Sequence, residues 1–240
     1  MKPIQIVVIS LEHSLDRKKK VAEVLSKTNL NWSFLLAVDG RELNYPIPEY
    51  PSKKVNRLLG FALTPNEIGC FLSHKETWKL AVKKNMVTIV FEDDFILLPH
   101  FEEVIQLLMN HPEQWGLVRL QALCTCSDKL HLEFGKFSLY RNQNDPLGAT
   151  AYIIKPESAI KLIQNSASIY EPLDHFLEHY QKHGVPMLAI KPYPVDISKA
   201  ESTISDRPTN RIPIKGLKKC IRSIYRQWDR MTSSEPWFPK

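Results

Sequence analysis

The chain has 240 residues, with 32 lysines and arginines against 26 aspartates and glutamates, so its formal net charge is +6. Residues 211–240 contain eight bases and two acids, which means that this segment carries the whole excess and residues 1–210 are neutral. Proteins that bind nucleic acid usually spread basic residues over a binding face of the fold, so this distribution argues against a nucleic-acid partner. We expect a neutral domain over residues 1–210 and a basic tail over 211–240 with a partner of its own.

Hydrophobic residues make up 43% of the chain and charged residues 24%, which is ordinary for a globular domain. Cys124 and Cys126 are spaced C-x-C, unlike the C-x-x-C pair of zinc and redox sites. No run approaches the roughly 18–20 apolar residues of a membrane helix, and no secretory signal is visible. These features predict a reduced, cytoplasmic protein whose cysteines pack as small apolar side chains.

The first half of the chain alternates apolar strands with helices. Thr64-Pro65-Asn66-Glu67 is a capping box with proline at the first helical position, and Ser14 is a candidate cap for an earlier helix. The expected elements are, in chain order, a strand over 4–9, a helix over 14–27, a strand over 32–38, an irregular segment over 41–64, a helix over 64–84 and a strand over 87–91.

The second half continues the alternation with one irregular insert. The expected elements are a helix over 100–110, a strand over 116–120, an insert with a hairpin over 124–147, a strand over 148–154, helices over 156–164 and 172–183, a strand over 187–190 and a proline-containing loop over 192–212. Strands and helices that alternate in this order predict an α/β fold with a mostly parallel central sheet.

Three adjacent acids, Glu92, Asp93 and Asp94, directly follow the apolar strand expected over 87–91. Open α/β sheets bind ligands at the carboxyl ends of their strands. Neighbouring carboxylates repel one another unless a cation or hydrogen-bond donors neutralise them, and their oxygens suit Mg²⁺ or Mn²⁺ shared with substrate phosphates. The triplet therefore predicts a divalent-metal site beside a diphosphate, and a solvated acidic turn is the alternative that spacing leaves open.

A basic helix start follows the first expected strand. Ser10-Leu11-Glu12-His13 leads into Asp16-Arg17-Lys18-Lys19-Lys20, and backbone N–H groups with an arginine at such a place can hold phosphates. For Lys18 to Lys20 we favour a solvated charge run on an exposed helix face. The pattern does not decide whether Arg17 binds a phosphate or belongs to the solvated charge run.

Three further features have a structural interpretation beside a functional one. His175, Glu178 and His179 match the H-x-x-E-H pattern of zinc peptidases, although so short a pattern arises readily by chance on an exposed helix. Asp174, at the expected start of that helix, is either a plain N-cap or a general base. His74 lies near Glu67 and Trp78 on one side of the helix over 64–84. A single histidine on a helix is more often structural than catalytic.

Several of these segments together carry a family resemblance. They are Val8-Ile9-Ser10-Leu11 with Asp16-Arg17, Val38-Asp39-Gly40, Leu63-Thr64-Pro65-Asn66-Glu67-Ile68-Gly69-Cys70-Phe71-Leu72-Ser73-His74, Phe91-Glu92-Asp93-Asp94, Gly148-Ala149-Thr150-Ala151-Tyr152-Ile153-Ile154 and Pro172-Leu173-Asp174. In this order they resemble glycosyltransferase family 25, which includes bacterial lipooligosaccharide galactosyltransferases and the collagen galactosyltransferase domain. The resemblance covers about residues 4–205, and Ser10 departs from the asparagine usual at that position.

The resemblance implies a GT-A-type nucleotide-sugar-binding domain and an inverting transfer of a sugar, usually galactose from UDP-galactose, to a glycan hydroxyl with Mn²⁺. Asp94 is similar to the metal ligand of the family, and Asp174 to its late aspartate, a candidate catalytic base. The positions it implies for binding the nucleotide sugar are Ser10, Leu11, Arg17, Asp39, Glu92 and Asp93. The implied acceptor is a lipooligosaccharide or lipopolysaccharide core glycan. A zinc metallopeptidase and a non-catalytic sugar-nucleotide-binding module remain as alternatives.

The tail over residues 211–231 has a helical pattern of its own. Bases mostly fall between apolar residues spaced three or four apart, which are Ile214, Leu217, Ile221, Ile224, Tyr225, Trp228 and Met231. A basic amphipathic helix with aromatic residues is typical of an interfacial membrane anchor, and a helix docked on the domain is the alternative. We expect the tail to bind an anionic membrane, on the inner face of a bacterial plasma membrane, where a lipid-linked oligosaccharide acceptor would be found.

Overall fold

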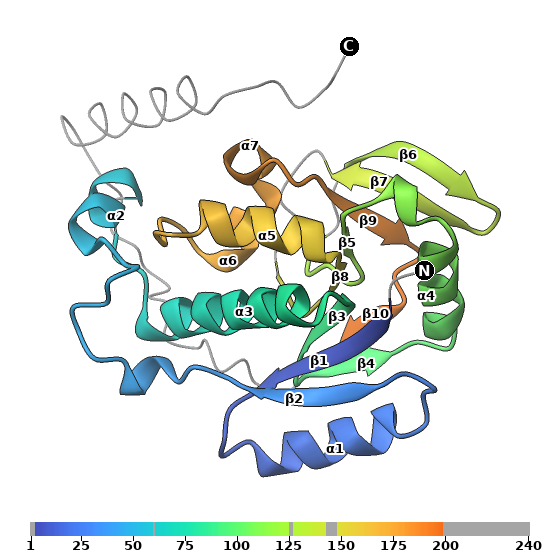
Figure 1. The fold of residues 1–240 in the computed structure, drawn as a ribbon, viewed down its shortest axis with the longest axis horizontal. Helices are drawn as coiled ribbons and strands as arrows, with labels where there is room; N and C mark the ends of the chain where they lie inside the picture. The colour runs from blue at the N-terminus through green and yellow to red at the C-terminus, as the bar shows by residue number, and fades with distance from the viewer. Residues whose placement is uncertain (1–2, 60, 125–126, 143–147, 199–240) are drawn as a thin grey trace.

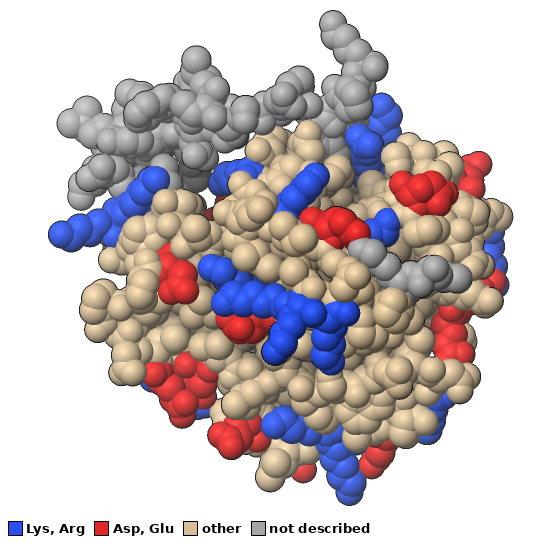
Figure 2. All heavy atoms as spheres, in the orientation of Figure 1, with Lys and Arg blue, Asp and Glu red and all other residues tan. Residues whose placement is uncertain are grey.

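The computed structural model describes residues 3–59, 61–124, 127–142 and 148–198 (Figure 1). The amphipathic helix expected over 211–231 lies outside these ranges. Within them, no helix combines the length and the apolar character required to cross a membrane. Basic and acidic side chains are interspersed over the face shown in Figure 2.

In the described part of the chain, the central sheet has the strand order β2-β1-β3-β8-β5-β9-β7-β6. The strands are β1 (Ile4–Ser10), β2 (Trp32–Leu36), β3 (Val87–Glu92), β5 (Leu117–Arg119), β6 (Asp128–Phe134), β7 (Phe137–Asn142), β8 (Ala151–Ile154) and β9 (Met187–Lys191). The pairings make β7 and β8 run against the other strands of this sheet, so the mostly parallel α/β architecture is confirmed.

Helices cover both faces of the sheet, as Figure 1 shows. They are α1 (Leu15–Leu25), α2 (Ser52–Leu59), α3 (Pro65–Lys84), α4 (Phe101–Asn110), α5 (Pro156–Asn165), α6 (Leu173–Glu178) and α7 (Tyr180–His183), with 3₁₀ turns η1 (Gly40–Glu42) and η2 (Pro112–Gln114). Neighbouring residues of a strand point to opposite faces. Ile89 accordingly packs in one buried cluster with Val104 of α4, and Val90 packs in the other with Trp78 of α3.

The start of α3 is fixed by the predicted capping box. Thr64 Oγ1 accepts the N–H of Glu67 at 3.2 Å, and Glu67 Oε2 accepts the N–H of Thr64 at 2.9 Å. The turn that follows β2 packs directly on this helix, because a Cβ atom on Gly69 would lie only 2.6 Å from the carbonyl oxygen of Val38. Glycine at position 69 thus lets the backbone of this turn approach α3 and hold Asp39 beside it.

Three local features differ from the sequence prediction. The segment over 41–64, expected to be irregular, contains α2. The short strands β4 (Phe95–Leu97) and β10 (Val195–Ile197) form a separate antiparallel pair, and three residues are too few to show a periodic pattern. The helix expected over 172–183 is divided at His179, whose φ of −80° and ψ of 58° are not helical. The expected hairpin is present as β6 and β7.

Candidate functional site

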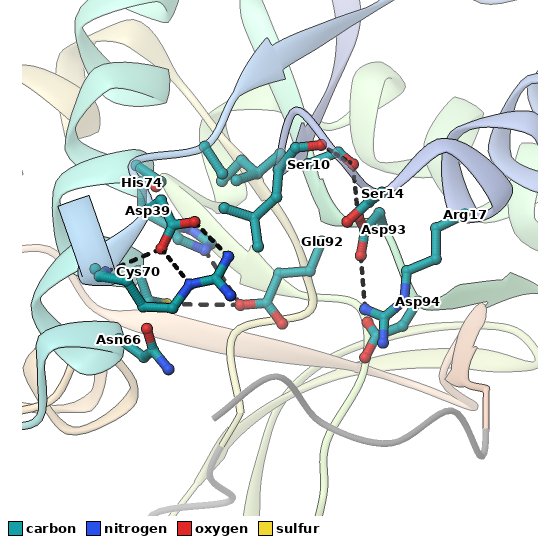
Figure 3. Close-up of a pocket in the computed structure, with 16 residues that line it drawn as sticks. Ser10, Ser14, Arg17, Asp39, Asn66, Cys70, His74, Glu92, Asp93 and Asp94 are labelled. Atoms are coloured by element: carbon teal, nitrogen blue, oxygen red, sulfur yellow. Dashed lines mark hydrogen bonds and ion pairs between the residues drawn. The ribbon is translucent and has the colours of Figure 1, made fainter. Parts of the chain in front are cut away.

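The predicted site residues meet where two neighbouring parallel strands end. β1 and β3 pair in parallel with Ile9 opposite Glu92, so the residues that follow both strands lie at the same edge of the sheet. A pocket of about 370 Å³ opens there, lined by residues of β1, α1, the turn after β2, α3 and the end of β3 (Figure 3). Its polar lining contains both acids and arginines.

Asp93 is fully engaged by side chains from the N-terminal part of the chain. Ser10 Oγ donates to Asp93 Oδ2 at 2.6 Å, and Arg17 donates to Asp93 Oδ1 at 2.9 Å. Figure 3 shows Asp93 between these two partners. Hydrogen bonds that involve an ionised group are shorter and stronger than neutral ones, so this group ties the start of α1 to the end of β3.

Asp94 is the acid of the triplet that protein groups do not neutralise. Its Oδ1 is buried and has no hydrogen-bond partner among the described residues. Burial, with the negative charges of Glu92 and Asp93, raises the pKa of Asp94 from 3.8 to about 6, and the charge of Arg17 only partly opposes this. A buried carboxylate oxygen without a partner, among carboxylates, fits a hard divalent cation such as Mn²⁺ or Mg²⁺.

Glu92 is held from the other side, by α3 and β8. Thr150 Oγ1 donates to Glu92 Oε2 at 3.1 Å, the Cys70 thiol lies 3.7 Å from Oε1, and His74 Nε2 lies 3.5 Å from the same oxygen. Burial alone would raise the pKa of Glu92, but the nearby His74, Thr150 and Cys70 outweigh it and hold that pKa below its ordinary value. Glu92 is therefore an ionised acceptor at neutral pH.

A buried polar group stands behind Glu92. His74 and Tyr152 are fully buried, and His74 Nδ1 lies 2.9 Å from the Tyr152 hydroxyl oxygen. Trp78 Nε1 donates to the same oxygen at 2.9 Å. Since the indole can only donate, the Tyr152 proton is free to go to His74 Nδ1. That tautomer places the other ring proton on Nε2, where it faces the Glu92 carboxylate.

Asp39 lies on the opposite rim of the pocket. It caps η1, accepts the backbone N–H of Arg41 at 2.9 Å, and accepts Arg41 side-chain donors at 3.0 and 2.6 Å. These hydrogen bonds, the side-chain ones first, lower the pKa of Asp39 to about 2. Arg41 is well exposed and lines the pocket.

The structure brings most of the predicted site residues together. Those that line the pocket are Ser10, Leu11, Arg17, Asp39, Glu92, Asp93 and Asp94. Asp174 is not among the lining residues: it is buried in the first turn of α6, where its Oδ1 accepts the N–H of His175 at 3.0 Å. The binding and catalytic roles of these residues stay predictions.

Sequence reasoning missed Arg41, Asn66 and Cys70, and treated His74 as structural. Asn66, Cys70 and His74 are four residues apart on α3, so they share one face of the helix. This four-residue spacing is visible in the sequence and could have identified the three side chains as one group. The interpretation of Cys70 as a small apolar side chain is incomplete, because its thiol also contacts Glu92.

The zinc-peptidase pattern does not form a cluster. Arg119 donates to Glu178 Oε1 at 2.6 Å, and both side chains are buried. His179, at the end of α6, pairs through Nδ1 with Glu171 at 2.7 Å. Among the described residues, the group of potential ligands that converges is Cys70, His74 and Glu92, and the H-x-x-E-H residues are not part of it.

Comparison with known proteins identifies related sequences. The family model described as "Glycosyltransferase family 25 (LPS biosynthesis protein)" matches residues 3–177. Procollagen galactosyltransferase 1-A of Xenopus laevis is 24% identical over 97% of this chain and 40% of its own length. Procollagen galactosyltransferase 2 of Homo sapiens is 24% identical over 97% of this chain and 39% of its own length. The chain thus spans less than half the length of these relatives.

A third relative aligns over a shorter part of the chain, with a higher sequence identity. A protein of Bos taurus named "Probable inactive glycosyltransferase 25 family member 3" is 31% identical over 48% of this chain and 21% of its own length. Relatives of this chain therefore include both named galactosyltransferases and a named inactive protein.

Asp93 is bonded by Ser10 and Arg17, whereas Asp94 Oδ1 has no partner among the described residues. This difference predicts opposite effects of the two acids on stability when no metal is bound. Because the folded-state pKa of Asp94 is raised from 3.8 to about 6, its ionisation destabilises the fold above pH 6, and this penalty vanishes as the pH falls to about 4. With EDTA present, Asp94→Asn should raise the melting temperature at pH 7.5 and have little effect near pH 4. Thermal unfolding across this pH range measures both.

The matched control is Asp93→Asn. It removes the charge that Ser10 and Arg17 hold, so it should lower stability at pH 7.5 by about 1–2 kcal/mol. If the two variants shifted stability in the same direction at pH 7.5, the distinction between these acids would be wrong.

Proposed function

Because the chain belongs to glycosyltransferase family 25, we propose that it is a metal-dependent hexosyltransferase that uses UDP-galactose as donor and inverts the anomeric centre. The family match and the named galactosyltransferases support sugar transfer. The observation that carries the proposal for this chain is Asp94, which follows the end of β3 and whose Oδ1 is buried with no hydrogen-bond partner among the described residues. A metal–diphosphate group is the kind of ligand that such an atom fits.

The proposed donor lies in the pocket with its diphosphate toward Asp94. Asp94 would hold Mn²⁺ or Mg²⁺ there, and such an ion would supply positive charge to stabilise the departing UDP. Arg17 and the exposed Arg41 line the pocket and supply positive charge for the phosphates. The end of β1, at Ser10 and Leu11, and the carboxylate of Asp39 supply polar groups for the nucleoside and ribose.

Glu92 has a positioning part in this proposal. His74, Thr150 and Cys70 fix its carboxylate in the floor of the pocket, between the α3 side chains and the Asp93–Asp94 pair (Figure 3). An ionised acceptor at that place is suited to a sugar or ribose hydroxyl. Asp93 binds no ligand directly while Ser10 and Arg17 occupy its oxygens, and it serves to place Arg17.

Inversion requires a base on the acceptor side. In the proposal Asp174 takes the proton of the acceptor hydroxyl as this attacks the anomeric carbon from the face opposite UDP. The base role of Asp174 rests on the family resemblance, because the side chain does not line the pocket.

We extend the proposal to a lipooligosaccharide or lipopolysaccharide core glycan as acceptor, on the strength of the family description. The basic tail suits this acceptor, since residues 211–231 would hold the domain at an anionic membrane on the cytoplasmic side. A non-catalytic sugar-nucleotide-binding module is the second candidate, because one matched relative is named probably inactive. Turnover of a UDP-sugar distinguishes the transferase from the non-catalytic binding module.

A screen of UDP-sugars tests the transferase proposal. The unmodified chain should hydrolyse or transfer from UDP-galactose with Mn²⁺ and should lose this activity in EDTA. Asp94→Ala should abolish it, while the exposed Asp196→Ala serves as control and should retain it. Metal-dependent turnover that survives in Asp94→Ala would refute the metal assignment, and no turnover of any UDP-sugar would favour the binding module.

Asp174→Asn tests the base. General-base catalysis typically contributes about 10²–10⁴-fold, so kcat should fall by this order while the KM for the donor changes little. An unchanged kcat would leave Asp174 as a structural residue of the first turn of α6, where Pro172 and not Asp174 is at the N-cap. Circular dichroism of the variant checks that α6 still folds.

Removal of residues 211–240 tests the membrane proposal. The full chain should sediment with vesicles that contain anionic lipid, more so at low salt, and the 1–210 chain should not. Equal sedimentation of both chains, or none of either, would contradict an anchor in the tail.

A further inference from the structure

The floor of the pocket brings together sulfur, nitrogen and oxygen donor atoms to which the proposed reaction assigns no metal ion. Cys70 and His74 lie one turn apart on α3, and Glu92 ends β3. One ligand atom from each lies within 4.8 Å of the other two. Figure 3 shows the three side chains turned toward one another, on the side of Glu92 away from Asp94.

The spacing of these atoms is close to that of ligands around one tetrahedral metal ion. Metal–ligand lengths of about 2.0 Å for nitrogen and oxygen and 2.3 Å for sulfur give ligand–ligand separations of roughly 3.3 Å for N···O and 3.5 Å for S···O. The observed separations are 3.5 Å from His74 Nε2 to Glu92 Oε1 and 3.7 Å from Cys70 Sγ to Glu92 Oε1. Each needs to shorten by only about 0.2 Å.

His74 presents the required atom. Its Nε2 is buried and makes no hydrogen bond within the described residues, although it points at Glu92. Without metal, the Tyr152 hydroxyl donates to Nδ1 and the ring proton is on Nε2. Metal binding moves the ring proton to Nδ1, which then donates to a lone pair of the Tyr152 oxygen. Histidine ligands usually donate from the second ring nitrogen to such a partner, which fixes the ring and its tautomer.

The geometry points to a second metal site in this pocket, in which Cys70 Sγ, His74 Nε2 and one oxygen of Glu92 bind Zn²⁺ or a metal of similar softness. Sulfur, imidazole and one carboxylate select such a metal, whereas the oxygen-rich surroundings of Asp94 select Mn²⁺ or Mg²⁺. All three ligands line the pocket, so the fourth position faces solvent and takes water or a bound ligand. Binding releases the thiol proton of Cys70 to solvent and replaces its contact with Glu92.

Cobalt is a suitable probe because Co²⁺ bound by a thiolate absorbs in the near ultraviolet. The metal-free full chain should develop a thiolate-to-cobalt band that saturates at one equivalent, is bleached by Zn²⁺ and is unaffected by excess Mn²⁺. Cys70→Ser should abolish the band and weaken Co²⁺ binding by more than about tenfold. No sugar or turnover enters this measurement, so its outcome is separate from that of the proposed transfer reaction.

The matched control keeps Cys70 and replaces the other cysteines, Cys124, Cys126 and Cys220, by serine. This control should retain the full band. A band that survives in Cys70→Ser, or that disappears in the control, would overturn the site, as would a failure of the unmodified chain to bind Co²⁺.

A second measurement needs no variant and so does not depend on whether Cys70→Ser folds. Alkylation of the native chain, read by peptide mass spectrometry, compares Cys70 with the exposed Cys124. One equivalent of Zn²⁺ should slow the alkylation of Cys70 at least tenfold and leave that of Cys124 unchanged, and Mn²⁺ should slow neither. Equal rates for Cys70 with and without Zn²⁺ would contradict the proposal.

Discussion

The constraint on which the site depends is the repulsion among three consecutive carboxylates at the end of a buried strand. The fold neutralises two of the three, each in a different way. Arg17 and Ser10 bond both oxygens of Asp93, while His74, Thr150 and Cys70 surround Glu92. Asp94 Oδ1 has no such partner among the described residues, and burial with the charges of Glu92 and Asp93 raises the pKa of Asp94 to about 6. A cation would stabilise its charge, which is why we propose that the metal and the diphosphate bind at this residue.

The rest of the architecture serves this arrangement. Parallel pairing of β1 and β3 puts the start of α1 beside the acids, and the close approach of Val38 to Gly69 holds the turn with Asp39 on the other rim. Behind Glu92, Trp78 and Tyr152 fix the ring of His74. The same polar floor that orients Glu92 also assembles the donor set proposed for a softer metal, so one pocket offers two kinds of metal environment.

The sequence predicts the sheet and one half of the site well, because apolar strands followed by polar residues imply a shared sheet edge. The contribution of α3 is harder to predict. Asn66, Cys70 and His74 share a helix face by spacing. Only the packing of α3 against β3, with the contacts of Cys70 and His74, shows that this face meets Glu92. At the break, His179 pairs with Glu171 eight residues away, and local helix propensity does not encode that contact.

The measurement that most directly tests the central claim is calorimetric binding of UDP to the full chain with Mn²⁺ and with EDTA. If Asp94 is the carboxylate left for a metal–diphosphate group, UDP binds tightly only with Mn²⁺. Asp94→Asn then weakens that binding by more than about tenfold. If UDP binds equally well in EDTA, or if Asp94→Asn leaves the Mn²⁺-dependent affinity unchanged, the three acids do not divide their roles as described.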